Sequence, residues 1–349
     1  MININNHTII KTATIRDALI KLDVLSNTSN VLTLFVLEGK SLIGSLTDGD
    51  IRRFLIQNDS LNSSVELAMN RNFNYISPKE TDIRKIRELR LSGIELLPCI
   101  NKSGNLVNIY DLKHKKSILQ IDAVLMAGGK GERLRPLTEK TPKPLLKIGE
   151  KAIIDYNVDL LINYGVESIY VTTNYLAEQI EEHFKQEKQG VKINCVREKE
   201  FLGTIASVKL IPELKNDEIL IMNSDLFTNI DFEDFYRHFL ENKADISVAA
   251  VPYSVNVPYG IFELEGRNIQ GVKEKPTYSY YANAGIYLLR RKWLDLIPNG
   301  RYYNATDFIE LLLLHGKNVI RYPLTGYWID IGKPVDYQKA QDIVEHIKV

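Results

Sequence analysis

The chain from residue 122 onward alternates between short apolar runs and amphipathic segments, and this alternation constrains the fold more than any other sequence feature. Four apolar runs have the length of buried strands, at 122–127, 167–173, 191–196 and 218–225. Three segments between them have apolar residues at helical spacing, at 152–165, 175–188 and 203–211. Such alternation predicts an α/β domain with a mostly parallel sheet and helices on both faces.

A change of character near the basic stretch at 113–117 predicts a boundary between two domains, which we place at 1–118 and 119–349. Within the first domain, a helical pattern followed by strand, turn and strand occurs twice, at about 1–60 and 61–118. This weak duplication indicates an α+β region built from two similar units.

The charge balance excludes some classes of partner. Lys and Arg total 44, as do Asp and Glu, which argues against nucleic acid or an anionic membrane. Cys99 and Cys195 cannot form a disulfide framework. The N-terminal segment lacks the features of a secretion signal, and no run of about 18 apolar residues occurs. We therefore expect a cytoplasmic protein.

A glycine-rich stretch, MAGGKGERLRPLTEKTPKPLL at 126–146, follows the first of these strands. Gly128, Gly129 and Gly131 allow backbone N–H groups to approach a ligand, and the following cationic side chains supply charge for phosphates. Three prolines stiffen the rest of the loop. Because ligands of α/β sheets bind at the carboxyl ends of the strands, this loop predicts a triphosphate site.

Two common phosphate-binding fingerprints do not fit this chain. The dinucleotide pattern G-x-G-x-x-G fails because, counted from Gly129, its last glycine falls on Leu134. The Walker pattern fails at Gly39-Lys40-Ser41, because Leu34 stands where the first glycine belongs. A nicotinamide dehydrogenase is therefore disfavoured.

Two aspartates, Asp225 and Asp330, each end an apolar strand-like run. Magnesium bound to a nucleotide is usually held by one or two protein carboxylates together with phosphates and water. The alternative is that each aspartate caps a helix or closes a turn. The position at strand ends makes both residues candidate ligands of Mg²⁺.

The loop at 126–146 strongly resembles the signature of the nucleoside-diphosphate-sugar pyrophosphorylases. The family pattern is G-G-x-G-x-R-L with a lysine about ten residues after the arginine, and Arg133 and Lys143 occupy those positions. The resemblance covers residues 121–349. It implies a Rossmann-like nucleotidyltransferase domain, and an enzyme that joins a nucleoside triphosphate to a sugar 1-phosphate and releases pyrophosphate.

The resemblance also implies a role for each motif. Mg²⁺ would be held by Asp225 and Asp330, and the leaving pyrophosphate by Arg133. Lys143 and Lys275 would contact the reacting phosphates. The expected nucleotide-binding residues are Met126, Ala127, Gly128, Gly129, Gly131, Glu198, Gly203 and Thr204. The expected sugar-binding residues are Gly260, Glu274, Asn283 and Gly285.

The base preference depends on Glu198, which stands where pyrimidine-using relatives commonly have glutamine. A carboxylate only accepts hydrogen bonds, and guanine offers adjacent N1–H and N2–H donors, so the residue favours GTP. The alternative is that Glu198 faces solvent in a charged loop. A UTP-using or dTTP-using enzyme therefore stays open.

The sugar is less determined. A catalytic domain behind an N-terminal region of this kind resembles guanylyltransferases of surface-sugar pathways, including the glucosamine 1-phosphate enzyme of legionaminic acid synthesis. Mannose 1-phosphate and heptose 1-phosphate are alternatives. A rival hypothesis is a regulatory protein that senses nucleotides without turnover, although a sensor has no need of the full set of charged residues.

The N-terminal region resembles a pair of cystathionine-β-synthase-type (CBS) domains, with the closing signature at 42–55. In that family a Thr-x-x-Asp element contacts a nucleotide, so Thr47 and Asp50 carry that role by position. The second copy has Asn108 in place of the threonine, which puts its site in doubt. The pair is either a regulatory nucleotide site or a dimerisation module that binds nothing, and a homo-oligomer, such as a dimer through this pair, is expected.

Overall fold

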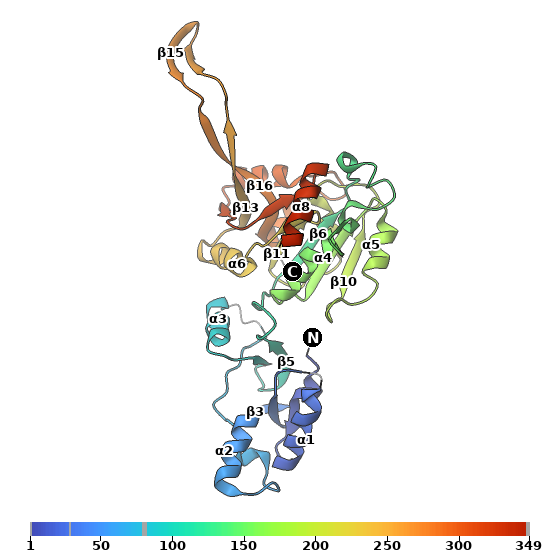
Figure 1. Ribbon diagram of the computed structural model, residues 1–349, viewed down its shortest axis with the longest axis vertical. Coiled ribbons are helices and arrows are strands. Elements are labelled where there is room, and N and C mark those ends of the chain that lie inside the picture. Colours follow the sequence, from blue (N-terminus) through green and yellow to red (C-terminus); the bar gives the residue numbers. More distant parts are fainter. Residues whose placement is uncertain (1, 28, 79–81, 347–349) are drawn as a thin grey trace. The chain divides into compact units, whose positions relative to one another are not determined.

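A computed structural model describes residues 2–27, 29–78 and 82–346 (Figure 1). The chain folds into two compact units. Unit 1 comprises Met1–Gln120 together with Asn163–Gly165, and unit 2 comprises Ile121–Ile162 and Val166–Val349. Within the described residues, none of the helices combines the length and the apolar character needed to cross a membrane.

The first half of unit 1 is a three-stranded sheet with two long helices. After the short 3₁₀ helix η1 (Ile4–His7), the elements are β1 (Thr8–Ile10), α1 (Ile15–Ser26), β2 (Thr33–Glu38), β3 (Ser41–Thr47) and α2 (Asp48–Asn58). The strand order is β1-β2-β3, with β1 parallel and β3 antiparallel to β2. Thr14 and Thr47 begin α1 and α2 with reciprocal capping boxes, which satisfy backbone N–H groups of the first turns.

The second half of unit 1 repeats the order helix, strand, turn, strand. Its elements are η2 (Val65–Leu67), α3 (Ile83–Leu91), β4 (Leu96–Ile100) and β5 (Leu106–Asp111). The two strands pair antiparallel across a turn in which Gly104 has a φ of 78°. Such a turn needs a glycine, because the left-handed region is costly for other residues.

Unit 2 is organised around one seven-stranded sheet. Its strands are β6 (Asp122–Ala127), β9 (Ser168–Thr173), β10 (Ile193–Arg197), β11 (Glu218–Asn223), β13 (Ile246–Asn256), β16 (Thr277–Arg290) and β17 (Val319–Pro323). The order is β10-β9-β6-β11-β16-β13-β17. Only β16 runs antiparallel to its neighbours within this described sheet, so the prediction of a mostly parallel sheet is confirmed.

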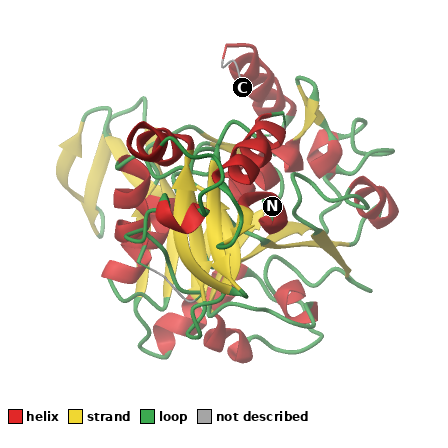
Figure 2. Cartoon of the chain, turned by 90° about the horizontal axis from the view of Figure 1, so that it is seen from below, coloured by secondary structure: helices red, strands yellow, loops and turns green. Residues whose placement is uncertain are grey.

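Helices enclose this sheet. They are α4 (Ile153–Asn163), α5 (Ala177–His183), α6 (Phe232–Glu241), α7 (Ala305–Leu314) and α8 (Pro334–His346), with the short 3₁₀ helices η3 (Glu132–Leu134), η4 (Lys143–Leu145), η5 (Ala206–Leu210) and η6 (Arg291–Leu296). Figure 2 colours strands yellow and helices red. Apolar side chains of α7 and η5 pack on one face of the sheet, in one cluster with Val124, Ile221 and Leu289. Strands β6 and β11 are buried at nearly every position, so both of their faces are covered.

Two predicted helices differ from the structure. The helix expected at 175–188 is limited to α5, because Leu176 adopts a left-handed φ of 50° just before it. The segment 203–211 forms only η5. Its first residues are tied elsewhere, since Thr204 Oγ1 accepts from the Ala305 N–H at 2.9 Å and the Ile205 N–H donates to Tyr303 O at 3.3 Å. These two residues are thus bonded to the 303–305 segment, and the helical turn spans only Ala206–Leu210.

Three small antiparallel pairs complete unit 2. Strand β7 (Lys147–Ile148) pairs with β8 (Lys151–Ala152), and β12 (Leu226–Thr228) pairs with β18 (Trp328–Asp330). Strand β14 (Ile261–Glu265) pairs with β15 (Asn268–Lys273). This last hairpin continues the outer ends of β13 and β16, and we call residues 252–282 the arm. Figure 1 shows the arm, with β15 at its far end, projecting away from the rest of unit 2.

Candidate active site

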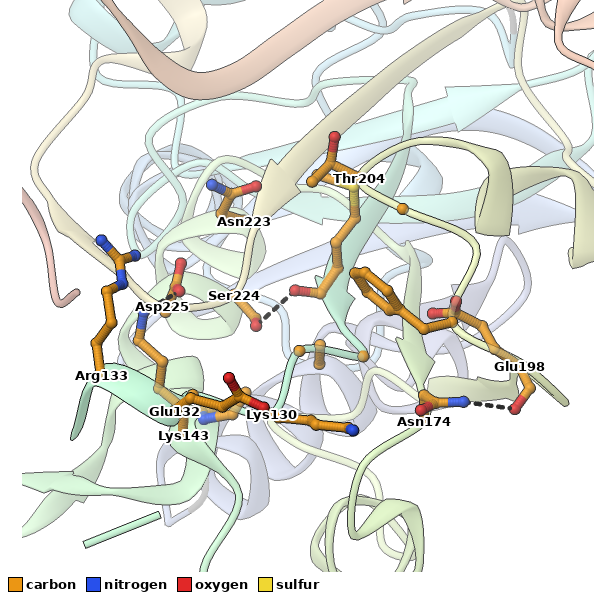
Figure 3. A pocket seen from close by; sticks show the side chains of 18 residues that line it. Lys130, Glu132, Arg133, Lys143, Asn174, Glu198, Thr204, Asn223, Ser224 and Asp225 are labelled. Atoms are coloured by element: carbon orange, nitrogen blue, oxygen red, sulfur yellow. Dashed lines mark hydrogen bonds and ion pairs between the residues drawn. The ribbon is translucent and has the colours of Figure 1, made fainter. Parts of the chain in front are cut away.

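A cavity of about 620 Å³ opens at the carboxyl ends of β6 and β11 in unit 2 (Figure 3). Its walls come from five regions of the chain: 126–133, 143–144, residue 174, the segment 198–204, and 223–225. Among the residues expected to bind nucleotide, Met126, Ala127, Gly128, Gly129, Gly131, Glu198, Gly203 and Thr204 all line it. The structure therefore brings the glycine-rich loop and the distant 198–204 segment to one cavity.

The glycine-rich loop is held in place by tight packing around Gly131. This residue has a φ of 62°, and a Cβ atom there would lie 3.0 Å from Thr138 Cγ2 and 3.1 Å from Lys143 Cβ. The Thr138 hydroxyl donates to Gly131 O at 2.8 Å. Only glycine fits this position without displacing its neighbours, because both the backbone angle and the space exclude a larger side chain.

Lys143 lies between the two aspartates that were expected to bind metal. Its side chain is nearly buried, and Nζ forms an ion pair with Asp225 Oδ2 and lies 3.7 Å from Asp330 Oδ1. The antiparallel pairing of β12 with β18 places Leu226 opposite Asp330 and so brings the two aspartates together. Two carboxylates far apart in sequence thus share one lysine at the edge of the cavity.

The carboxylates of Asp225 and Asp330 form a candidate site for a cation. Burial raises the pKa of Asp330, and the nearby Asp225 raises it further, whereas Lys143 and Arg133 lower it. The Oδ1 atom of Asp225 is buried without a hydrogen-bond partner. Such an open acceptor beside a second carboxylate fits Mg²⁺, which takes oxygen ligands and is often held by only one or two protein carboxylates. The described residues contain no cluster of three or more His, Cys, Asp or Glu side chains suited to a metal.

Arg133 lines the same cavity and packs against the chain just after Asp330. A Cβ atom at Gly332 would lie 3.1 Å from Arg133 Nη2 and 3.3 Å from Cζ. Because Gly332 has no side chain, the Arg133 guanidinium fits in the space beside it. In Figure 3, Arg133 and Lys143 lie near Asp225 at one end of the cavity.

Glu198 lies at the other end of the cavity, and the alternative in which it faces solvent is wrong. The residue is 3% exposed, and its Oε2 atom accepts from the Leu202 N–H at 2.9 Å. A Cβ atom at Gly128 would lie 2.6 Å from Glu198 Oε1, so the carboxylate borders the glycine-rich loop. Burial raises the pKa of Glu198, while hydrogen bonds from Leu202 and Thr172 oppose that shift.

Several residues that line the cavity were not predicted from the sequence: Lys130, Glu132, Pro144, Asn174, Phe201, Asn223 and Ser224. Phe201 is partly exposed and packs edge-on against Tyr302, with ring centroids 6.0 Å apart. The Ser224 hydroxyl donates to Met126 O at 2.7 Å and links the ends of β11 and β6. The available sequence signal for Phe201 was an aromatic residue directly after the charged run at 197–200.

The residues expected to bind sugar fall into two groups. Gly285 has a φ of 71°, and a Cβ atom there would lie 2.6 Å from Nδ2 of Asn223, which lines the cavity. Asn283 accepts from the Gly285 N–H at 2.9 Å. In contrast, Gly260 and Glu274 lie on the arm and do not line the cavity, and the same is true of Lys275, which was expected to contact a reacting phosphate.

Unit 1 contains a second cavity, of about 340 Å³, lined by Thr47, Asp50 and residues of both halves of the unit. The Thr47 N–H donates to Asp50 Oδ2 at 2.9 Å as part of the capping box of α2, and the Thr47 hydroxyl donates to the same oxygen at 2.6 Å. Arg53 Nη2 forms an ion pair with Asp50 Oδ1 at 2.5 Å. The Asp50 carboxylate therefore lies at the cavity but already has a local structural role.

Comparison with known proteins gives consistent matches for unit 2. Residues 122–346 match the family described as "Nucleotidyl transferase". Mannose-1-phosphate guanyltransferase beta-B of Xenopus laevis is 30% identical over 224 residues, 62% of this chain and 62% of that protein. D-glycero-alpha-D-manno-heptose 1-phosphate guanylyltransferase of Aneurinibacillus thermoaerophilus is 28% identical over 229 residues, 65% of this chain and 99% of that protein.

Solved structures agree in fold. The UDP-glucose pyrophosphorylase from Acinetobacter baumanii superimposes with a TM-score of 0.52 at 21% identity, covering 66% of this chain and 95% of that one. At this identity the likeness concerns the fold alone. The chain spans less than two thirds of the length of the Xenopus protein that it matches.

Proposed function

Because the chain belongs to the nucleotidyl transferase family, we propose that it is a sugar 1-phosphate nucleotidyltransferase. One observation carries the proposal. Arg133, Lys143 and the Asp225–Asp330 pair converge at one end of a cavity that the glycine-rich loop lines. In the reaction, an oxygen of the sugar 1-phosphate bonds to the α-phosphorus of the nucleotide. The bond from that phosphorus to the bridging oxygen breaks, and pyrophosphate leaves.

The chemistry does not require a general base, since the attacking phosphate oxygen is already anionic at neutral pH. The barrier comes from repulsion between anions and from charge that builds up during transfer, so positioned cations supply most of the catalysis. Arg133 would hold the departing pyrophosphate. Lys143, which is paired with Asp225 in the free protein, would donate to a reacting phosphate once the substrates bind.

Asp225 and Asp330 would hold Mg²⁺. The open Oδ1 acceptor of Asp225 and the neighbouring Asp330 carboxylate support this assignment. When bound, the ion would neutralise charge on the nucleotide phosphates. Lys143 would then be released from its carboxylate partners and could turn toward the substrate.

We further propose that the nucleotide is GTP. Glu198 offers acceptor oxygens at the end of the cavity away from the cations, and guanine offers two adjacent N–H donors. Two relatives that match this chain are guanylyltransferases by name, one acting on mannose 1-phosphate and one on a heptose 1-phosphate. Glucosamine 1-phosphate, mannose 1-phosphate and heptose 1-phosphate are the candidate sugars.

A substrate panel tests these proposals. The four nucleoside triphosphates are combined with glucosamine, mannose, glucose and heptose 1-phosphates, with and without Mg²⁺, and pyrophosphate release is measured. We expect magnesium-dependent turnover that is fastest with GTP. Turnover with UTP or dTTP alone would remove the role given to Glu198. Nucleotide binding without turnover for every pair would favour the non-catalytic sensor and overturn the enzyme.

For unit 1 we propose a CBS-type pair with a regulatory nucleotide site, supported by the cavity that both of its halves line. Calorimetric titration of the full chain with adenine nucleotides, before and after the change Asp50→Asn, tests this site. Loss of binding in the variant supports it. Unchanged heats together with a lower melting temperature would mean that Asp50 only caps α2.

A further inference from the structure

One aromatic side chain in the wall of the unit 2 cavity has no role in the reaction described above. Phe201 lines the cavity and is 43% exposed, although an apolar ring of this size is usually buried. Its sequence neighbour Leu202 packs against the apolar core of unit 2 instead. The chain therefore turns Leu202 inward and leaves the ring of Phe201 at the cavity wall.

Hydrogen bonds fix the backbone on both sides of Phe201. The Glu198 N–H donates to Thr173 O at 2.8 Å, and the Glu198 carboxylate accepts from the Leu202 N–H at 2.9 Å. Leu202 O in turn accepts from the Tyr303 N–H at 2.9 Å. A ligand that contacts a side chain on a fixed loop loses little affinity to the ordering of that loop, so the ring is presented in advance.

A second aromatic residue supports the Phe201 ring. Tyr302 is 59% exposed and does not line the cavity. Its ring meets that of Phe201 at an interplanar angle of 64°, with the centroids 6.0 Å apart. Aromatic pairs favour such an edge-to-face arrangement, which covers at most one face of either ring. Much of the Phe201 ring is therefore held in place without being covered.

The same loop carries the carboxylate that we propose to bind the base. Glu198 lies three residues before Phe201, and its Oε1 atom borders Gly128 of the glycine-rich loop. A Cβ atom added at Gly129 would meet no atom within 4 Å, so the loop leaves open space beside its backbone. A base has a hydrogen-bonding edge and a flat face. The Glu198 carboxylate suits the edge, and an aromatic ring suits the face.

We propose that the ring of Phe201 stacks on the base of the bound nucleotide. The inference rests on the nucleotide site proposed above and assigns different parts of the base to two residues of one loop. Glu198 accepts hydrogen bonds from the edge of the base, which determines the preference among bases. Phe201 contacts its face, which adds affinity without reading the edge. The hydrogen bonds between Glu198 and Leu202 hold the two side chains in a fixed relation.

Three substitutions at one position separate stacking from simple apolar contact. Phe201→Ala removes the ring, Phe201→Leu keeps an apolar side chain without a flat face, and Phe201→Tyr keeps the ring. Isothermal titration calorimetry of the full chain, with Mg²⁺ and without sugar 1-phosphate, measures the Kd of GTP. We expect this Kd to rise about tenfold for Phe201→Ala and at least about threefold for Phe201→Leu, and to change by less than about twofold for Phe201→Tyr.

Two controls show whether the loss of affinity belongs to the base. Inorganic triphosphate has no base, so its Kd should be the same for the wild type and Phe201→Ala. Tyr75→Leu changes an exposed tyrosine of unit 1 that lines neither cavity, and this variant should bind GTP as the wild type does. Circular dichroism checks that all variants are folded.

The possible outcomes separate this inference from the proposed function. Equal GTP affinity of the wild type and Phe201→Ala would overturn stacking and leave the nucleotide site intact. Wild-type affinity of Phe201→Leu would also overturn it, because apolar contact would then suffice. An equal loss of affinity for GTP and for inorganic triphosphate would overturn it as well, since the change would then act on the phosphate site. A wild type that binds neither ligand would overturn the nucleotide site and this inference together.

Discussion

The glycine-rich loop and the arm both extend from strands of the same sheet, yet they are held in opposite ways. The loop is fixed by its own residues, as Thr138 and Lys143 around Gly131 illustrate, and by Glu198 of a distant segment beside Gly128. The arm is held only at its base, and its apolar side chains have no cover within unit 2. The geometry of the loop is therefore determined by contacts within the chain, whereas the surroundings of the arm's apolar side chains depend on what binds them.

The largest effect should come from the cation end of the cavity. Asp225→Asn removes one of the two carboxylates proposed to hold Mg²⁺, and we expect turnover to fall by about 10³-fold, as for the loss of a main electrostatic group. Asp217→Asn, at an exposed ion pair with Arg291, is the control and should leave turnover unchanged. Pyrophosphate release measures both, and near-normal activity of Asp225→Asn would reject its assignment.

A matched glycine pair compares the loop and the arm directly. Gly131 and Gly266 have nearly the same φ, 62° and 61°, but only Gly131 is closely surrounded. Gly131→Ala should lower kcat/KM by about 10²-fold, because it displaces Lys143, which we propose to contact a reacting phosphate. Gly266→Ala meets no atom within 4 Å and should keep full activity, at a cost of about 1 kcal/mol in backbone strain. Equal losses of activity in the two variants would contradict the proposed difference between the loop and the arm.

A smaller effect is expected at the end of the cavity that we propose to bind the base. Glu198→Gln should reduce the preference for GTP over UTP by about tenfold, in keeping with one hydrogen-bonding pair. Competition between the two nucleotides measures this ratio, and Glu200→Gln, on the neighbouring exposed loop, is the control. An unchanged preference for GTP over UTP would show that another residue determines which base is bound.

The same variant has a pH signature. Burial raises the pKa of Glu198 above its usual value of 4.5, so the folded protein binds this proton more tightly than the unfolded chain. The wild type therefore loses stability as the pH rises from about 4.5 through the raised value, and Glu198→Gln should not. Urea unfolding between pH 4 and 7 measures the difference, which should grow with pH. A constant difference would contradict the shift.

The smallest effect is expected on the arm. Lys275 is exposed and lies outside the cavity, and its predicted contact with a reacting phosphate would be weakly held. Lys275→Ala should raise KM for the sugar 1-phosphate by only a few-fold, as expected for about 1 kcal/mol at an exposed charge. Lys273→Ala, in an exposed pair with Glu263, is the control. Equal KM values for both variants and the wild type would remove Lys275 from the substrate site.

The sequence was most informative where local chemistry decides the structure. Strands β6 and β11 were predicted from their apolar runs, because they are buried on both faces. The glycine-rich loop was recognisable because its conformation requires glycine at fixed positions, as Gly131 shows. Asp225 and Asp330 were predicted as a pair because each follows an apolar run and the family resemblance implies that both hold the metal.

The sequence was less informative where a contact with a distant segment decides the structure. The segment 203–211 has helical spacing, but bonds from Thr204 and Ile205 to residues 303–305 leave only a 3₁₀ turn. Phe201 lines the cavity through a loop whose path depends on those same bonds. The exposed position of Lys275 follows from the length of β13 and β16, which no local motif indicates.

The pairing of β12 with β18 limits when, during synthesis of the chain, the two carboxylates can come together. Asp330 is synthesised about 105 residues after Asp225, and the strand that carries it must add to β12 before the two carboxylates meet. At about 5–20 residues per second, ribosomes need roughly 5–20 seconds to cover that interval. During this time the glycine-rich loop and Asp225 already exist, but the chain cannot assemble the pair. The carboxylate pair that we propose to hold Mg²⁺ therefore forms only after the segment carrying Asp330 has been synthesised.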